Sequence, residues 1–241
     1  MQKNSAGIKL KGVTPCEPDD AFDPETETIE PIGPYSFIQK RSGNRYTQDS
    51  ILLVNFVLES IGKDSKIIDL GAGTGVMPIL IAAKTTATEI TGVEVVDGCA
   101  ALAERNVRLN GLSSRIKIVA GDYRNLGVTS CESADYPEGS FDIVISNPPY
   151  AKAGAGRQSP DPARRIGRSE VMGGLQDMLA VSSHLAGNGG RMFFVFPSAR
   201  LDEMISEMDA LGIKPMRILR EEMANGKKTK VFFIEAGIAG C

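Results

Sequence analysis

The sequence predicts an α/β fold: a mainly parallel sheet with helices on both faces and an antiparallel hairpin at its C-terminal end. Short apolar runs alternate with segments of helical periodicity between residues 66 and 212, and such repeated strand–helix units form right-handed crossovers between parallel strands. The closing stretch "PMRILREEMANGKKTKVFFIEAG" has the pattern strand, turn, strand. The chain has 241 residues, of which 42% are hydrophobic, enough for one large domain with a core.

The N-terminal part of the chain is less regular. Residues 1–34 are polar, contain several prolines and carry an acidic run, so we expect a partly disordered extension there. The stretch 35–48, "YSFIQKRSGNRYTQ", predicts a hairpin that turns within Ser42–Asn44. Residues 49–62, "DSILLVNFVLESIG", have a helical apolar face that stops at a glycine. We therefore take residues 35–241 as a single domain that begins with this hairpin and helix.

The alternating region contains strands and helices that follow one another along the chain. The expected strands are 66–73, 89–96, 116–122, 140–150 and 191–197. The expected helices are 76–85, 99–111, 170–186 and 200–212. Two long connections, 123–139 and 151–168, have the length that is typical of functional or disordered loops in a compact domain.

Composition and charge narrow the classes of function. The net charge of -3 gives no global basic field, so a nucleic-acid partner would need a local basic patch. The four cysteines lack a Cys-x-x-Cys pair and the single histidine is His184, so we expect neither a metal site nor a disulfide framework. The first residues lack the apolar core of a secretory signal, and no segment approaches the roughly 20 apolar residues of a membrane span. We expect a cytoplasmic protein without a membrane partner.

A glycine-rich loop, "DLGAGTG", follows the strand that begins at residue 66. Gly71, Gly73 and Gly75 allow the backbone to pass close to a ligand at the carboxyl end of a strand, where open α/β sheets bind ligands. A dinucleotide fingerprint would require glycine where the chain has Val76. The spacing, preceded by Asp69, therefore favours a nucleoside without a pyrophosphate; a plain tight strand–helix turn is the alternative.

Two further acids stand at the ends of the next strands. Glu94 lies about twenty residues past the glycine loop, where a carboxylate can accept hydrogen bonds from ribose hydroxyls. Asp122 ends the following strand and is placed to accept from an adenine amino group. Each acid alone has the alternative reading of a surface carboxylate. Together with Asp69 they predict a nucleoside site along one edge of the sheet.

The strand at 140–150 ends in an unusual tetrad, "NPPY". Asn147 offers a side-chain oxygen and Pro148 a carbonyl whose direction the proline backbone fixes, so two hydrogen-bond acceptors stand together with few competing donors. Two acceptors that receive both N–H groups of a planar amine favour a pyramidal, more nucleophilic nitrogen. Tyr150 can stack on a planar base. The alternative is a rigid strand exit with a surface aromatic.

In this order and spacing, "DLGAGTG", "GVEV", "AGD" and "NPPY" resemble the class I S-adenosylmethionine-dependent methyltransferases that modify amino nitrogens. The resemblance runs from Tyr35 to the C-terminus. It implies a Rossmann-like domain with a seven-stranded sheet, S-adenosyl-L-methionine as the methyl donor, S-adenosyl-L-homocysteine as the product, and no metal.

A narrower resemblance connects the chain to the bacterial tRNA1(Val) adenine-37 N6-methyltransferases. "RYTQDSILLVNFV" before the glycine loop and "ARRIGRSEVMGGLQDML" after the tetrad carry it. The chain departs from that pattern at Ser169, where histidine is expected between Arg168 and Glu170. The resemblance implies methylation of the N6 amine of an adenine in RNA, with adenine 37 of a tRNA as the expected target. We expect a monomer or a weak homodimer.

The resemblance also assigns roles to residues. Those expected to bind the donor are Thr47, Asp49, Asp69, Gly71, Gly73, Gly75, Glu94, Asp122 and Tyr123. Those expected to receive the target base are Asn147, Pro148 and Tyr150. Residues 35–62 are expected to close over the donor.

The expected reaction is a direct displacement in which the target nitrogen attacks the sulfonium methyl in line. Alignment is the main catalytic contribution, and no strong base is required. The RNA phosphates would meet a basic loop beside the tetrad, whose alternative reading is a solvated loop. Its basic residues are Lys152, Arg157, Arg164, Arg165 and Arg168. A second basic cluster, in the final hairpin, consists of Lys227, Lys228 and Lys230.

Other functions remain open at this point. Enzymes with this tetrad also methylate a glutamine amide of translation release factors, or adenines in ribosomal RNA or DNA. The first residues are too short and polar for the helical domain usual in the glutamine branch, and no separate DNA-recognition region is visible. A non-catalytic nucleoside- or RNA-binding protein is a different class, which the intact tetrad argues against. A nicotinamide dehydrogenase is disfavoured by the missing third glycine position.

Overall fold

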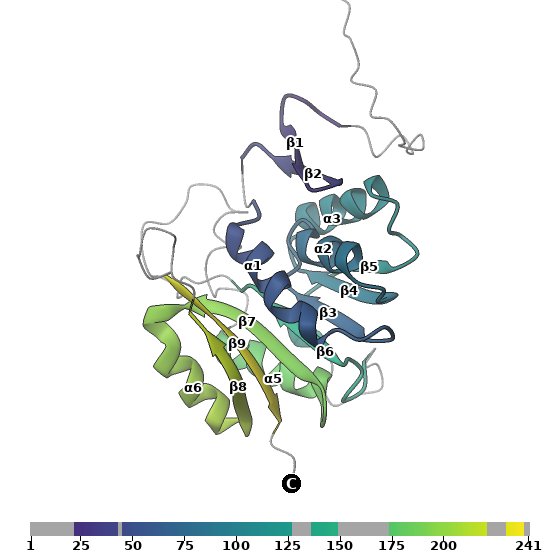
Figure 1. Ribbon diagram of the computed structural model, residues 1–241. Coiled ribbons are helices and arrows are strands. Elements are labelled where there is room, and N and C mark those ends of the chain that lie inside the picture. The colour runs from purple at the N-terminus through teal and green to yellow at the C-terminus, as the bar shows by residue number, and fades with distance from the viewer. Residues whose placement is uncertain (1–21, 43–44, 127–135, 149–173, 221–229, 239–241) are drawn as a thin grey trace, which may run out of the picture.

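A seven-stranded sheet forms the centre of the protein (Figure 1). The computed structural model describes residues 22–42, 45–126, 136–148, 174–220 and 230–238. The strand order across the sheet is β5-β4-β3-β6-β7-β9-β8. The strands are β3 (Lys66–Leu70), β4 (Glu89–Glu94), β5 (Ile116–Ala120), β6 (Ile143–Ser146), β7 (Arg191–Pro197), β8 (Ile213–Leu219) and β9 (Val231–Ile238).

Strand directions confirm the predicted mainly parallel sheet with an antiparallel C-terminal element. Strands β5, β4, β3, β6 and β7 run parallel to one another. The last strand, β9, inserts between β7 and β8 and is antiparallel to both. The turn expected between β8 and β9 falls on residues 221–229, outside the described part of the chain.

Helices cover both faces of the sheet, as predicted (Figure 1). The helices are α1 (Gln48–Val57), α2 (Val76–Lys84), α3 (Asp97–Leu109), α5 (Leu175–Ala186) and α6 (Leu201–Ala210). Apolar side chains of α1, α2 and α3 form one core layer, and those of α5 and α6 form the other. Pro78 lies in the first turn of α2, where a missing N–H is tolerated. None of the helices in the described ranges has the length and apolar character needed to span a lipid bilayer.

The N-terminal hairpin differs from the prediction. Strand β2 (Tyr35–Lys40) pairs with β1 (Glu27–Ile32), which precedes it, and the chain turns at Gly33, whose φ is +59°. The predicted pairing of residues 35–41 with the residues after Ser42 is therefore wrong, and Gly43 and Asn44 themselves lie outside the described residues. Residues 27–34 belong to the hairpin and not to the polar extension expected up to residue 34. Residues 1–21 lie outside the described residues, so the extension remains a prediction for them.

Buried polar contacts with α3 explain why the acidic β1 segment folds. The carboxylate of Glu27 accepts hydrogen bonds from Arg105 on α3, at 2.7 and 3.0 Å, and from Lys40 on β2, at 2.7 Å. Asn110, the C-cap residue of α3, binds both backbone groups of Ser36. These partners lie far from β1 in the sequence, so a local pattern of hydrophobic residues could not reveal them.

Candidate functional site

The carboxyl ends of β3 and β6 lie side by side. Asp69 on β3 is in register with Ile145 on β6, and the Ser146 hydroxyl donates to the Leu70 carbonyl at 2.7 Å. The glycine loop and Asn147 therefore follow directly after the carboxyl ends of two neighbouring strands. The predicted convergence of the glycine loop and the start of the tetrad on one edge of the sheet is observed.

The glycine loop is fixed by its neighbours on β4. The amides of Gly71 and Ala72 both donate to the Val93 carbonyl at 2.9 Å, and the Gly73 amide donates to Oε2 of Glu94 at 2.8 Å. Gly71 and Gly73 have φ values of +87° and +57°, and the space where each would carry a side chain is open. These two glycines leave room for a ligand against the backbone.

Gly75 has a different role in the loop. Its φ is +81°, and a Cβ there would lie 3.2 Å from the Cβ of Ala103 on α3. The absence of a side chain therefore permits the close approach of the start of α2 to α3. Direct ligand contact by Gly75 stays a prediction.

The two acids of the loop region are buried in different ways. Asp69 is completely buried, and neither of its carboxylate oxygens has a hydrogen-bond partner among the described residues. Glu94 is buried as well, but each oxygen accepts a backbone N–H, from Gly73 at 2.8 Å and from Val96 at 2.9 Å. An unpartnered buried carboxyl group is rare in folded proteins and calls for an explanation such as a ligand.

Both carboxyl groups hold their protons more strongly than in water. Burial, reinforced by the charge of Glu94, raises the pKa of Asp69 well above its ordinary value. Burial also raises the pKa of Glu94, although the backbone N–H groups of Val96, Gly73 and Val95 act in the opposite direction. Perturbed acids that share a sheet edge are typical of functional sites.

Asp122 lies two residues beyond the end of β5, near Glu94: the amide of Gly121 donates to the Glu94 carbonyl at 2.9 Å. The carboxylate of Asp122 is ion-paired with Arg124 and accepts from its backbone amide at 2.9 Å. Burial alone would raise the pKa of Asp122, but the hydrogen bonds from Arg124 hold it below the ordinary value. Tyr123 packs against the α5–α6 core layer. The adenine contact expected of Asp122 stays a prediction.

The first turn of α1 reaches the exit of β6. The side-chain amide of Asn147 donates from Nδ2 to the hydroxyl of Ser50 at 2.9 Å, and Ser50 is buried. Thr47 is the N-cap of α1, and Asp49 lies in its first turn. The helix expected to cover the site is thus in contact with the predicted catalytic asparagine.

Ser50 is a functional candidate that the sequence patterns missed. It lies between the predicted Asp49 and Ile51 in the segment "TQDSILL". The available signal for Ser50 was its position in the first turn of the helix that precedes the glycine loop. The contact joins residues 97 positions apart, so local periodicity could not reveal it.

Several predicted site residues fall outside the described residues. Tyr150 and the basic loop residues Lys152, Arg157, Arg164, Arg165 and Arg168 are among them, as are Lys227 and Lys228 of the second basic cluster. Their expected roles remain predictions. Pro148 is described and is half-buried beside Asn147.

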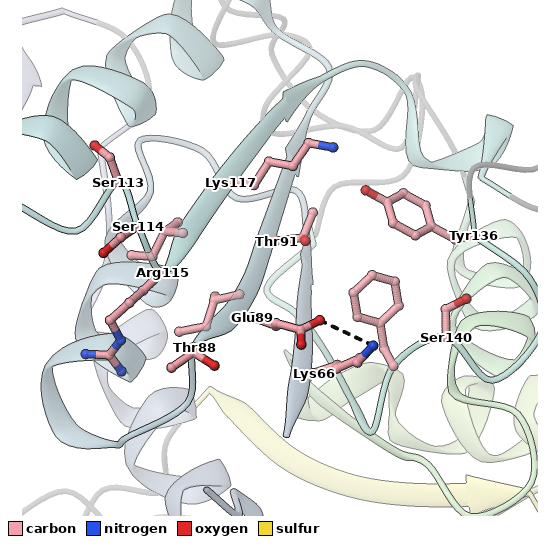
Figure 2. Close-up of a pocket in the computed structure, with 13 residues that line it drawn as sticks. Lys66, Thr88, Glu89, Thr91, Ser113, Ser114, Arg115, Lys117, Tyr136 and Ser140 are labelled. Atoms are coloured by element: carbon pink, nitrogen blue, oxygen red, sulfur yellow. Dashed lines mark ion pairs between the residues drawn. The ribbon is translucent and has the colours of Figure 1, made fainter. Parts of the chain in front are cut away.

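A cavity of about 480 Å³ opens at the opposite edge of the sheet (Figure 2). Its wall includes Lys66, Glu89, Thr91 and Lys117, at or near the amino ends of β3, β4 and β5, and Lys66 forms an ion pair with Glu89. Of the predicted site residues that the structure describes, none lines it. Because open α/β sheets bind ligands at the carboxyl ends of their strands, we do not assign the function to this cavity.

Comparison with known proteins agrees with a functional site at the carboxyl ends of the parallel strands, which we call the carboxyl edge. Residues 42–200 match the methyltransferase small domain family. A tRNA1(Val) (adenine(37)-N6)-methyltransferase from Aeromonas salmonicida is 28% identical over 146 residues, which cover 60% of this chain and 57% of that protein. A 4-amino-L-phenylalanine/4-methylamino-L-phenylalanine methyltransferase from Streptomyces pristinaespiralis is 26% identical over 189 residues, covering 75% of this chain and 60% of that protein. The matches thus span little more than half the length of these curated relatives.

Solved structures share the fold. The crystal structure of a predicted O-methyltransferase from Agrobacterium tumefaciens superposes with a TM-score of 0.59 at 22% identity, covering 79% of this chain and 81% of that one. The family match extends over well over half of the chain and includes the glycine loop, the three acids and Asn147. The chain belongs to the methyltransferase small domain family.

Proposed function

We propose that the protein is an S-adenosylmethionine-dependent methyltransferase that methylates the N6 amine of an adenine in RNA, with adenine 37 of a tRNA as the target. The observation that carries this proposal is that the glycine loop and Asn147 follow the carboxyl ends of two neighbouring strands, β3 and β6. Membership of the methyltransferase small domain family supports the transfer chemistry. The activity named for the Aeromonas relative supports the choice of substrate.

The carboxyl edge fits the methyl donor. When bound, the donor supplies an electrophilic methyl group on a sulfonium sulfur. The carboxyl of Asp69, which has no partner within the described ranges, would accept hydrogen bonds from the amino group of the donor, next to the open backbone at Gly71 and Gly73. Each oxygen of Glu94 keeps a lone pair beyond its backbone bond, which suits ribose hydroxyls. Asp122 and Tyr123 would flank the adenine.

Asn147 and Pro148 would receive the target amine. The Ser50 hydroxyl binds Nδ2 of Asn147, which fixes the orientation of the amide and places the carboxamide oxygen on the other side of the group. That oxygen and the Pro148 carbonyl would each accept one N–H of the amine. Tyr150 would stack on the base. These residues align and polarise the nucleophile, a contribution of the kind that positioning makes to transfer reactions.

An adenine in structured RNA must leave its stack to reach such a site. The basic loop, which includes Arg164 and Arg165, would bind the phosphates around the adenine. Contacts of this kind release counterions, so tRNA affinity should fall steeply as salt concentration rises.

The decisive assay incubates the full chain with labelled S-adenosylmethionine and unmodified total tRNA, followed by digestion and identification of the methylated nucleoside. Label in N6-methyladenosine from one tRNA species is the expected result. A parallel incubation with 4-amino-L-phenylalanine, the substrate named for the Streptomyces relative, tests a small aromatic amine as acceptor. Transfer to that amine, with none to tRNA, would overturn the substrate part of the proposal. The variant Asn147→Ala is the negative control.

A further inference from the structure

The N-terminal hairpin contacts the glycine loop directly, through Thr74. The side-chain amide of Gln39, on β2, donates from Nε2 to the Thr74 hydroxyl at 2.7 Å. Both side chains are buried, and Gln39 has no exposed surface. This hydrogen bond joins residues 35 positions apart and ends on the residue between Gly73 and Gly75.

Asn106 on α3 completes the connection. Its Nδ2 donates to the backbone carbonyl of Thr74 at 2.9 Å and to that of Ile38 at 3.0 Å. Its Oδ1 accepts from the amide of Ile38 at 2.7 Å. The Asn106 side chain is completely buried and therefore bridges the hairpin and the glycine loop from a rigid helix.

We propose that Gln39 and Asn106 are positioning residues for the methyl donor, and that they act through Thr74 by holding the glycine loop in its binding conformation. The proposal rests on the donor site proposed above. The left-handed backbone of the loop is a conformation that only glycine adopts readily, so the intrinsic preference of the chain does not specify it. Bonds from β4 hold its first residues, and the hairpin and α3 hold Thr74.

This arrangement has a thermodynamic consequence for binding. If the loop of the free protein samples other conformations, the apparent dissociation constant rises in inverse proportion to the competent fraction. Thr74→Val keeps the shape of the side chain but removes the hydroxyl that accepts the hydrogen bond from Gln39. Nε2 of Gln39 then stays buried without that acceptor. The loss of one such bond is expected to raise the dissociation constant for S-adenosylhomocysteine about tenfold.

The hairpin offers a matched control at Asn110. This side chain, at the C-cap of α3, binds the amide and carbonyl of Ser36 on β2 at 3.0 and 2.8 Å. Its Nδ2 also donates to the backbone carbonyl of Asn106 at 2.8 Å, but its hydrogen bonds to described residues do not extend to Thr74. Asn110→Ala therefore loosens the hairpin without removing the contact to the loop. Thr74→Ser, which keeps the hydroxyl, tests rescue.

The experiment measures affinity for S-adenosylhomocysteine by calorimetry on the full chain. Thr74→Val should bind about tenfold more weakly than wild type, whereas Thr74→Ser and Asn110→Ala should stay within about twofold. With saturating donor, the turnover number of Thr74→Val should stay within about twofold of wild type, because bound donor restores the loop. A merely structural defect would instead reduce the active fraction and hence the turnover. Equal affinity of Thr74→Val and wild type would overturn the proposal.

Hydrogen exchange in the absence of ligand separates this proposal from the proposed function. The amides of residues 71–75 should exchange faster in Thr74→Val than in Asn110→Ala, whatever ligand the loop binds. If wild type binds no S-adenosylhomocysteine but this difference is found, the donor assignment fails and the support of the loop stands. Unchanged exchange in Thr74→Val would overturn the support itself.

Discussion

Glu27 and Asp69 are both buried acids, with 1% and 0% of their surface exposed, but their surroundings are opposite. Glu27, at the interface of the hairpin and α3, accepts hydrogen bonds from Arg105 and Lys40. Although burial alone would raise the pKa of Glu27, these partners lower it from 4.5 to about 2. Asp69, at the carboxyl edge, has no hydrogen-bond partner in the described part of the chain, and its pKa is raised well above 3.8.

The difference separates the region around Glu27, whose contacts stabilise the fold, from the region around Asp69, where the proposed donor would bind. At the hairpin interface, Arg105 and Lys40 satisfy the buried carboxylate of Glu27. At the carboxyl ends of the strands, Asp69 has no hydrogen-bond partner among the residues that the structure describes, so its burial carries the cost of desolvation. Substitutions in the first region should therefore lower stability. In the second they should lower function and leave stability unchanged or improved.

The largest functional effect is expected at Asn147. Asn147→Ala removes an acceptor that would act on the nucleophile in the transition state, so turnover should fall about 10²–10³-fold by analogy with the loss of a single oxyanion-hole donor. Donor affinity should change by less than about threefold, because the residue faces the acceptor amine. Single-turnover rates and calorimetry measure the two quantities. Turnover close to wild type would remove Asn147 from the reaction.

The largest stability effect is expected at Glu27. Because its folded-state pKa lies below the ordinary value, its contribution is present above pH 4.5 and is lost as the pH falls from 4.5 towards 2. Glu27→Gln should lower the free energy of unfolding by about 3 kcal/mol at pH 7, and by progressively less as the pH falls through that range. Urea denaturation at several pH values measures the difference. A deficit that is independent of pH would show that the ion pair is not its cause.

Asp69→Asn should separate function from stability. Loss of the charge-bearing acceptor should weaken binding of S-adenosylhomocysteine by about ten- to a hundredfold. The raised folded-state pKa means that this acid costs stability above pH 3.8, and the cost grows as the pH rises towards the folded-state value. The variant should therefore unfold at a temperature about 2–4 °C higher at pH 7 if it regains about 1 kcal/mol. Reduced stability together with unchanged binding would reverse the assignment of the two regions.

A smaller effect is expected at Ser50, which orients Asn147 from α1. Ser50→Ala should reduce turnover about tenfold with donor affinity unchanged, and Ser50→Thr, which keeps a hydroxyl, should restore most of it. Steady-state kinetics at saturating donor measures both variants. If alanine and threonine behave alike, the hydroxyl does not orient the amide.

The sequence predicted the features that follow from local pattern and strand ends. The alternation of strands and helices from Lys66 onwards, and the placement of Gly71 and Asn147 on one edge, depend on periodicity and on parallel strand direction, and both were confirmed. The pairing of β1 was missed because the acidic, proline-containing segment "ETIEPI" is stabilised by Arg105, which lies 78 positions away. That Asp69 has no hydrogen-bond partner among the described residues could not be predicted either, since it depends on which groups the folded chain places within hydrogen-bonding distance.

A calorimetric titration of the wild-type chain with S-adenosylhomocysteine, with Asp69→Asn and Glu27→Gln alongside, tests directly whether the glycine loop and Asp69 form a donor site. We expect one bound molecule per chain, weakened binding for the Asp69 variant and near-wild-type affinity for the folded Glu27 variant. No binding by wild type, or equal loss of affinity in both variants, would contradict a donor site at these residues.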